Sequence, residues 1–155
     1  MKRRQSETST NAPLELREFL CFAVYATGHA FNRVYQPLLK ELNLTYSQFI
    51  AMILLWDQDD QTVGELGRKL SLQSNTLTPM LKRLEALGYV KRARDTVDER
   101  QVSISLTDSG RKLRTRASEI VRCVRTATNL QDRKMKELVG DLTVLRQALE
   151  GYSSG

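Results

Sequence analysis

The spacing of the apolar residues changes at Gly88, and this change restricts the possible folds more than any other feature of the sequence. Before Gly88, the stretch TLTPMLKRLEAL has apolar residues at steps of three and four, which predicts an amphipathic helix. After it, QVSISL alternates apolar and polar residues, as a half-buried strand does. YVKRAR and QVSISL flank the charged segment DTVDER, so we expect two short strands joined as a hairpin. Gly88 itself is a typical helix terminator.

A short helix and a turn precede the amphipathic helix. Thr62 and Glu65 have the spacing of a capping box in TVGELGRKL, and the turn SLQSN is rich in helix-capping side chains. Pro79 is expected near the first turn of the second helix, where proline is tolerated. Short helix, turn, second helix and hairpin, in this order, predict a mainly α chain with a small β-hairpin wing, which is a winged helix-turn-helix.

Longer helices are predicted on both sides of this unit. From Leu14 onward, apolar residues cover so much of the first helix that we expect it to be buried on more than one side. Pro37 lacks a backbone N–H, so this helix is expected to kink or stop near Gln36. Two further helices are predicted to begin at the capping residues Thr45 (with Gln48 in the box) and Thr107, and a last one covers about residues 131–149.

Charge and composition limit the classes of partner. The chain has 155 residues, a net charge of +6 and a pI near 9.5, which suits one domain with an anionic partner, nucleic acid before membrane. Polar residues follow the basic start MKRR, and the longest apolar run, FIAMILLW, is too short to span a bilayer. We therefore expect a cytoplasmic protein with reduced thiols. Two distant cysteines and a single histidine predict no metal site, and no cofactor motif is present.

The winged helix-turn-helix suggests which residues touch DNA, because its second helix enters the major groove. The exposed face of that helix carries hydroxyl, amide and basic side chains, which suit base edges and phosphates. An arginine at the hairpin tip would enter the minor groove, with an aspartate holding its side chain. The alternatives are a solvated helix face and a surface charge cluster. The candidates are Ser74, Asn75, Thr76, Thr78, Lys82 and Arg83 on the helix, and Arg94, Asp98 and Arg100 on the hairpin.

Two segments resemble a known family of regulators. The core of MarR-type transcription regulators is similar to SNTLTPMLKRLEALGYVKRARDTVDERQVSISLTDSG, with its signature at Asp98-x-Arg100, Leu106-Thr107 and Gly110. The organic-hydroperoxide-sensing branch of that family, OhrR, is similar to LCFAVYATGHAFNRVYQPLLKELNLTYSQF. The resemblance covers about residues 14–150. It implies a MarR-like homodimeric repressor that binds an inverted repeat in double-stranded operator DNA and leaves it when organic hydroperoxide oxidises a cysteine.

The resemblance also implies where the sensor lies. The reactive cysteine of the first helix matches Cys21, and two tyrosines that contact it from the partner subunit match Tyr35 and Tyr46. Two-cysteine members have a second thiol that matches Cys123, which implies a disulfide between Cys21 and Cys123 of the other subunit after oxidation. The spacing agrees with a contact between subunits, because Cys21 and Tyr35 are 14 residues, or about 21 Å, apart on one helix. Tyr25, one turn from Cys21, is the third supporting tyrosine.

The chemistry follows from the thiolate, which attacks peroxides and is favoured by phenol hydroxyls that donate to sulfur. Attack gives a sulfenic acid, which a second thiol traps as a disulfide. Other interpretations stay open. In one, Cys21 is only a small buried apolar residue, and the regulator is released from DNA by a small aromatic ligand. In another, Cys123 has no role. A thiol peroxidase is a further alternative, but an enzyme is not predicted, since no residue pair resembles a turnover site. His29 is assigned no role.

The expected organisation is a single compact fold with four segments. These are a disordered tail (1–12), N-terminal dimerisation helices (13–44), the winged helix-turn-helix region (45–107) and C-terminal dimerisation helices (108–150).

Overall fold

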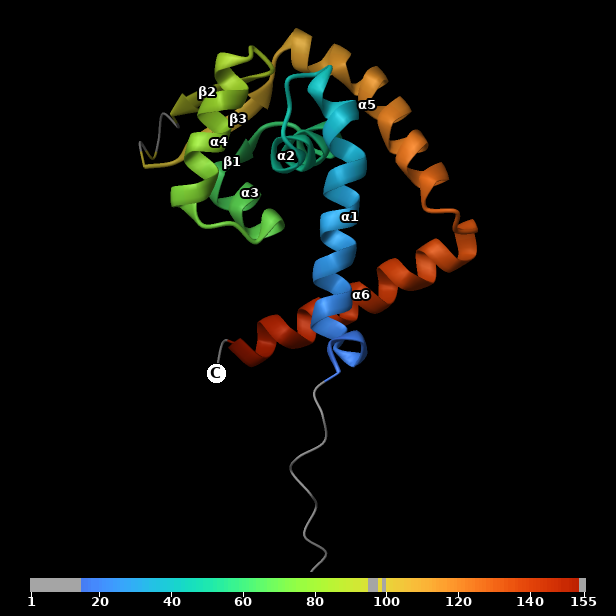
Figure 1. Ribbon diagram of the computed structural model, residues 1–155. Coiled ribbons are helices and arrows are strands. Elements are labelled where there is room, and N and C mark those ends of the chain that lie inside the picture. Colours follow the sequence, from blue (N-terminus) through green and yellow to red (C-terminus); the bar gives the residue numbers. More distant parts are fainter. Residues whose placement is uncertain (1–14, 95–97, 99, 154–155) are drawn as a thin grey trace, which may run out of the picture.

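The computed structural model describes residues 15–94, 98 and 100–153 (Figure 1). The predicted tail, residues 1–12, lies outside this range, as does part of the predicted hairpin tip. The mainly α fold with a small sheet is confirmed. In chain order the elements are η1 (Leu16–Glu18, a 3₁₀ turn), α1 (Leu20–Lys40), α2 (Tyr46–Asp57), β1 (Gln61–Thr62), α3 (Val63–Leu70), α4 (Ser74–Ala86), β2 (Val90–Arg94), β3 (Val102–Leu106), α5 (Asp108–Ala127) and α6 (Asp132–Ser153).

The wing is a three-stranded antiparallel sheet with the strand order β1-β3-β2. β2 and β3 pair along their whole length, from Val90 opposite Leu106 onward, which confirms the predicted hairpin. Gly88 follows the end of α4 with φ +76°, a left-handed conformation that glycine adopts without steric cost. The sequence did not predict β1, because its two residues are too few to show an alternating pattern.

Three side chains cap the helices as predicted. Thr45 accepts a hydrogen bond from the backbone N–H of Gln48, and the Gln48 side chain accepts one from the N–H of Thr45. Thr62 and Glu65 form the same reciprocal box at the start of α3. Thr107 accepts from the N–H of Gly110 at the start of α5. Each cap satisfies backbone donors that a helix start leaves free, and together these caps set where α2, α3 and α5 begin.

Of the two outcomes predicted for Pro37, a kink or a stop near Gln36, the stop is not found, because α1 continues through Pro37 to Lys40. An interior proline removes a hydrogen bond and costs about 3 kcal/mol. Leu39, two residues further on, is fully buried in the core. Burying a leucine stabilises by about 1.5–3 kcal/mol. Tertiary packing of this last turn therefore offsets most of the local cost.

Pro79 lies just after the first turn of α4, which begins at Ser74, so its position near that turn agrees with the prediction. Leu77 and Leu81, on either side of Pro79, are fully buried. Packing of this face against the core again maintains a helix through a proline.

The core lies where α2, α3, α4 and the sheet meet the last turns of α1 and the inner face of α5. We call residues 46–106 the winged unit. The ring centroid of Phe49 lies 5.6 Å from that of Tyr35 on α1 and 6.2 Å from that of Trp56. The contact with Tyr35 joins the winged unit to α1. The largest fully buried side chains are Leu39, Phe49, Met52, Leu55, Leu66, Leu77, Leu81, Leu84, Ile104, Gln61 and Val90.

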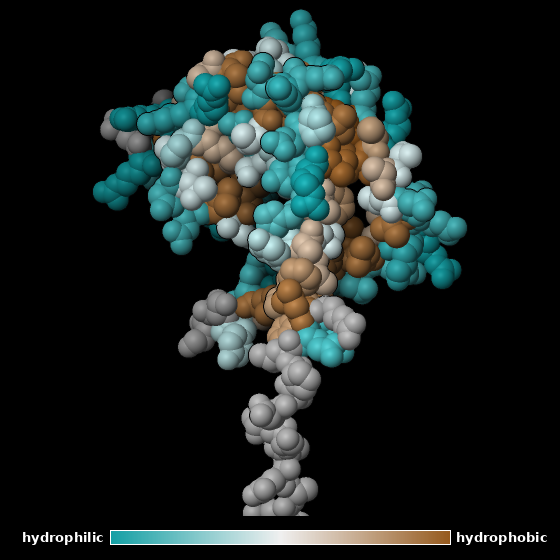
Figure 2. Space-filling view, in the orientation of Figure 1, coloured by the Kyte–Doolittle hydropathy of each residue, from teal (hydrophilic) through white to brown (hydrophobic). Residues whose placement is uncertain are grey.

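A second set of apolar side chains is exposed, so in a single chain α1 is not buried on more than one side. Figure 2 shows apolar side chains gathered along α1 and towards α5 and α6. We call this region the arm surface, and its exposed members include Phe19, Leu20, Phe22, Val24, Phe31, Val34, Val121, Leu138, Val139, Leu142, Val144 and Leu149. Among residues 15–94, 98 and 100–153, no helix combines the length and the apolar character needed to cross a membrane.

Candidate functional site

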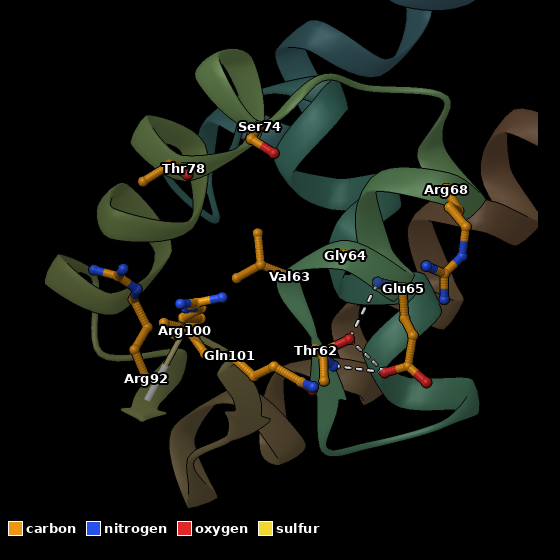
Figure 3. A pocket seen from close by; sticks show the side chains of 11 residues that line it. Thr62, Val63, Gly64, Glu65, Arg68, Ser74, Thr78, Arg92, Arg100 and Gln101 are labelled. Carbon is orange, nitrogen blue, oxygen red and sulfur yellow. Dashed lines mark hydrogen bonds between the residues drawn. The ribbon is translucent and has the colours of Figure 1, made fainter. Parts of the chain in front are cut away.

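A groove of about 730 Å³ opens on the winged unit, between the start of α3, the start of α4 and the wing. Figure 3 shows its side chains, with Ser74 and Thr78 on α4 and Arg92 and Arg100 on the wing. Three arginines and one glutamate make its lining basic, which suits an anionic ligand. The groove is lined by Thr62, Val63, Gly64, Glu65, Arg68, Ser74, Thr78, Arg92, Arg100, Gln101 and Val102.

The structure brings together only some of the predicted DNA-binding residues. Ser74, Thr78 and Arg100 line the groove, although the sequence separates the helix from the wing. The other predicted residues of α4 and β2 are exposed but lie outside the groove lining. These are Asn75, Thr76, Lys82, Arg83 and Arg94.

Sequence reasoning missed Arg92, which is half-buried on β2. Its backbone N–H donates to Glu85 Oε1 at 3.2 Å, and its guanidinium lies 3.8 Å from Glu85 Oε2, so α4 and the wing are tied together. Its Nε is buried and has no hydrogen-bond partner among the described residues. The available signal was its place in VKRAR, two residues after buried Val90, where the strand alternation puts a charge on the inward face.

Asp98 lies beside Arg100, but the bond between them goes to the Arg100 backbone, whereas the prediction had the aspartate hold the arginine side chain. Asp98 Oδ1 accepts a hydrogen bond from the backbone N–H of Arg100 at 3.1 Å, and Oδ2 accepts one from the Gln101 side chain at 3.4 Å. The backbone N–H of Gln101 also donates to the Asp98 carbonyl at 2.8 Å. The aspartate therefore orders the backbone from which the Arg100 side chain projects into the groove.

Glu65 puts a negative charge into the same groove. Its carboxylate accepts from the backbone N–H of Thr62 at 2.7 Å and from the Thr62 hydroxyl at 2.8 Å (Figure 3). These bonds, followed by the positive charges of Arg68 and Lys69, hold the pKa of Glu65 below its ordinary value. Glu65 therefore stays ionised at neutral pH and occupies the backbone N–H of Thr62, the N-cap residue of α3, so this amide is not free for a phosphate.

Both thiols are exposed in the single chain, so the interpretation of Cys21 as a core residue is not met there. Cys21 and Tyr25 lie on one face of α1, four residues apart, beside the arm surface. His29, four residues further along, packs edge-on against Tyr25 with ring centroids 4.4 Å apart. Cys123 lies on α5, and the neighbouring Arg125 is paired with Asp132.

Tyr35 and Tyr46 form a pair at the other end of α1. Their ring centroids are 5.0 Å apart, and both side chains are half-buried. Burial raises the pKa of each phenol, and for Tyr35 the nearby Tyr46 raises it further. Both hydroxyls therefore stay protonated well above neutral pH and can donate hydrogen bonds. Because α1 is one continuous helix from Leu20 to Lys40, this pair is separated from Cys21 of the same chain by most of the helix.

Metal ligation has no support in the described part of the chain, where no three His, Cys, Asp or Glu side chains are grouped to hold an ion. The chemistry available is that of exposed thiols, phenol donors and a basic groove.

The fold and the groove define a winged helix-turn-helix protein. Comparison with known proteins narrows this class: the family described as "Transcriptional regulator SarA/Rot" matches residues 33–116, more than half of the chain. The chain belongs to this SarA/Rot and MarR-type family of winged-helix transcriptional regulators, which confirms the predicted family.

Individual relatives are similar over most of their length. The chain is 45% identical to the HTH-type transcriptional regulator TtmR of Methylorubrum extorquens, over 93% of this chain and 74% of the relative. It is 40% identical to the organic hydroperoxide resistance transcriptional regulator of Bacillus subtilis, over 88% and 92%.

AbfR of Staphylococcus epidermidis gives the structural comparison. Reduced AbfR bound to DNA is 38% identical, with a TM-score of 0.74 over 85% of this chain and 90% of AbfR. A disulfide-containing form of AbfR is 37% identical, with a TM-score of 0.61 over 88% and 90%.

Proposed function

We propose that this protein is a dimeric, redox-sensing repressor, which binds an inverted repeat in double-stranded DNA until an organic hydroperoxide oxidises Cys21. The arrangement of α1 carries the proposal. It has an exposed thiol near its start, and near its end Tyr35 packs against Tyr46 of α2. Cys21 and Tyr35 are about 21 Å apart along the helix, which is beyond side-chain reach. The phenols therefore serve a thiol of a second copy.

The groove supports DNA binding by the winged unit. Ser74 and Thr78 at the start of α4 supply small polar groups for a helix that enters the major groove, and Arg100 supplies a cation from the wing. The reduced form of AbfR, which is similar over most of this chain, is seen on DNA. Two copies related by a two-fold axis would present two α4 helices to half-sites about 34 Å apart.

The arm surface supports the dimer. Apolar side chains such as Phe22, Phe31 and Val34 are each more than one third exposed on α1, beside further exposed apolar residues of α5 and α6. Monomeric proteins rarely expose such continuous apolar area. A second copy that covers this surface would also bring its own Cys21 towards the tyrosine pair.

The proposed sensor chemistry is a two-electron oxidation. The Cys21 thiolate attacks the outer oxygen of the hydroperoxide, the O–O bond breaks, and the alkoxide leaves and takes a proton to become an alcohol. The sulfur now carries a sulfenic acid. The Cys123 thiol of the other subunit then attacks this sulfur, a disulfide forms and water leaves. A disulfide form of the similar protein AbfR supports this second step.

The test uses the full-length protein and a duplex that the reduced protein selects from a random DNA pool. We expect one equivalent of cumene hydroperoxide to weaken wild-type binding about tenfold or more, within the usual range of coupling between sites. Cys21→Ser keeps the size of the side chain but loses the nucleophile, so it should bind the same duplex and ignore the oxidant. A Cys21→Ser protein that still leaves DNA after oxidation would show that Cys21 is not the sensor.

Non-reducing gels test the role of Cys123. Oxidised wild type should run as a dimer band that dithiothreitol removes. Cys123→Ser should remain monomeric on the gel, form sulfenic acid at Cys21 and over-oxidise at high peroxide. If fully oxidised, DNA-free wild type gives only a monomer band, the disulfide between subunits is rejected.

A second candidate function has one observation in its favour. An apolar pocket of about 290 Å³ lies between α1, α5 and α6, and Phe31, Val34 and Leu138 contribute to its lining. A small aromatic ligand would suit such a pocket, and the thiols would then be bystanders. Thiol titration distinguishes the two functions, since only the redox sensor loses free thiols as one equivalent of hydroperoxide releases it from DNA.

A further inference from the structure

The carboxylate of Asp59 holds three parts of the molecule together. Asp59 lies in the turn between α2 and β1, and its Oδ1 accepts from the backbone N–H of Leu106 at 2.8 Å, at the end of β3. The same oxygen accepts from the N–H of Asp60 at 2.8 Å. Its Oδ2 accepts from Nη1 of Arg111, in the first turn of α5, at 2.6 Å. One side chain therefore joins the wing to the helix that carries Cys123.

The strand register explains why Asp59 reaches Leu106. β1 pairs with β3 at Gln61 opposite Ile104, so a longer β1 would place residue 59 opposite Leu106. The chain instead turns at Asp60, which has φ +56°. The Asp59 side chain then supplies the acceptor that the missing strand residue would have supplied, and the last N–H of β3 stays bonded.

The first turn of α5 is also held tightly from its other sides. Trp56 Nε1 of α2 donates to the carbonyl of Gly110 at 2.9 Å. The backbone N–H of Thr107 donates to the carbonyl of Tyr89 at 3.1 Å. An added Cβ at Gly110 would overlap that same carbonyl oxygen, so the backbone of α5 is in direct contact with the residue that precedes β2. We call Trp56, Asp59, Leu106, Gly110 and Arg111 the α5 joint.

The α5 joint and Cys123 lie near opposite ends of α5. Cys123 is 15 residues after Asp108, the first residue of α5, which is about 22 Å along the helix. One face of α5 is buried along the helix, with Gly110 near the joint and Val124 beside Cys123, whereas Val121 on the other side of Cys123 belongs to the exposed arm surface. A displacement of the Cys123 end must either be absorbed at the joint or move the wing with the helix.

We propose that Asp59, through Arg111 and Leu106, is a positioning residue that transmits displacement of α5 to the wing, so that oxidation at the arms changes DNA binding. This inference rests on the function proposed above. The physical basis is that one carboxylate bonds both to the helix and to the strand, so the two cannot shift against each other without breaking a charge-assisted hydrogen bond. Loss of either bond would weaken this link, so that less of a displacement of α5 reaches the wing.

The electrostatics of Asp59 agree with a carboxylate that stays ionised. Burial alone would raise its pKa, but the backbone donors of Leu106 and Asp60 and the guanidinium of Arg111 together hold the pKa below the ordinary value. Both links therefore persist over the whole neutral range.

The experiment compares DNA affinity before and after oxidation for wild type, Asp59→Asn and Arg111→Ala, with the full-length protein and the selected duplex. For each variant, the readout is the Kd of the oxidised protein divided by the Kd of the same variant in its reduced form. Asp59→Asn can still accept from Leu106 but loses the charge that binds Arg111. We expect this ratio to fall about threefold or more in both variants, in the range that single residues change coupling. Arg111→Lys, which keeps a cation, should recover part of the ratio.

Arg114→Ala is the matched control, because it removes an arginine from the next turn of α5 that does not bond to Asp59. It should keep the wild-type ratio. Disulfide formation on gels should be the same in all variants, which separates transmission from sensing. Equal ratios in wild type, Asp59→Asn and Arg111→Ala would overturn the inference while the proposed function stands. If wild type itself does not lose DNA affinity on oxidation, the proposed function fails first.

Discussion

The winged unit buries its apolar side chains within one chain, whereas the arm surface leaves its apolar side chains exposed. In the winged unit, Leu66, Leu77, Leu81 and Leu84 have no exposed area at all. On the arms the exposed fractions are large, with 66% for Val144. Both regions are helical and both carry apolar side chains at helical spacing. They differ in whether the same chain supplies the covering partner.

α1 belongs to both regions and shows what the difference means. Leu39 near its end is fully buried by the winged unit, whereas Leu20 at its start is 59% exposed. Cys21 follows Leu20, so the proposed sensor lies where burial depends on a second copy. A thiol at such a place can respond to oxidation without disturbing the core of the DNA-binding unit, and a change there acts on how two copies are arranged.

The largest effect is expected from a substitution in the core of the winged unit. Leu81→Ala removes a fully buried side chain from α4 and should lower the free energy of unfolding by about 2–5 kcal/mol. Val144→Ala trims an exposed arm residue and should cost much less in unfolding while it weakens self-association. Denaturant unfolding and sedimentation at several protein concentrations measure both quantities. Equal unfolding losses for the two variants would contradict the contrast between the regions.

The next effect concerns DNA binding, which we assign to the winged unit alone. Arg100→Ala should weaken binding to the selected duplex by about 1–3 kcal/mol, because it removes a cation from the groove. The control is Arg133→Ala on α6, an arm arginine paired with Glu137 at 3.3 Å. Fluorescence anisotropy at fixed salt compares the two. Unchanged affinity for Arg100→Ala would remove this residue from the DNA contact.

A smaller effect tests whether the two regions meet at the sensor. Tyr35→Phe and Tyr46→Phe each remove only a hydroxyl donor, whose bond to a charged acceptor is worth about 1.5–3 kcal/mol. Oxidation of Cys21 by cumene hydroperoxide should therefore slow by about tenfold or more in each variant. Stopped-flow thiol loss gives the rate, and self-association should be unchanged. If both variants react at the wild-type rate, the phenols do not assist the thiol.

The smallest effect is the pH dependence of the contact between the winged unit and α5. The folded pKa of Asp59 lies below its ordinary value of 3.8, so its stabilising contribution is present above that pH and is lost as the pH falls through the folded pKa. The stability difference between wild type and Asp59→Asn should therefore shrink as the pH falls from 6 to about 3. We expect at most about 1 kcal/mol, since the pair is partly exposed. Thermal unfolding across this range measures it, and a difference that grows in acid would contradict the assignment.

Much of the fold was predictable because its signals are local. The caps at Thr45, Thr62 and Thr107 each involve residues three positions apart, and all three are observed. The first helix does not stop at Pro37, since local rules counted the lost hydrogen bond but not the burial of neighbours such as Leu39. Within the candidate site, Ser74, Thr78 and Arg100 were found from helix and hairpin positions. Arg92 was missed, since its tie to Glu85 depends on how the strand packs against α4.

The sequence alone therefore determined the order of helices and strands, the placement of two thiols on separate long helices, and the distance that keeps Cys21 from Tyr35 within one chain. These follow from backbone periodicity and caps, which depend on neighbours a few residues apart. Only the tertiary structure decided which apolar faces are covered within one chain and which stay exposed for a second copy. It also decided that Asp59 bonds Leu106, 47 positions away, and Arg111 beyond it. Such contacts depend on how complete elements pack together, and no short stretch of sequence encodes that packing.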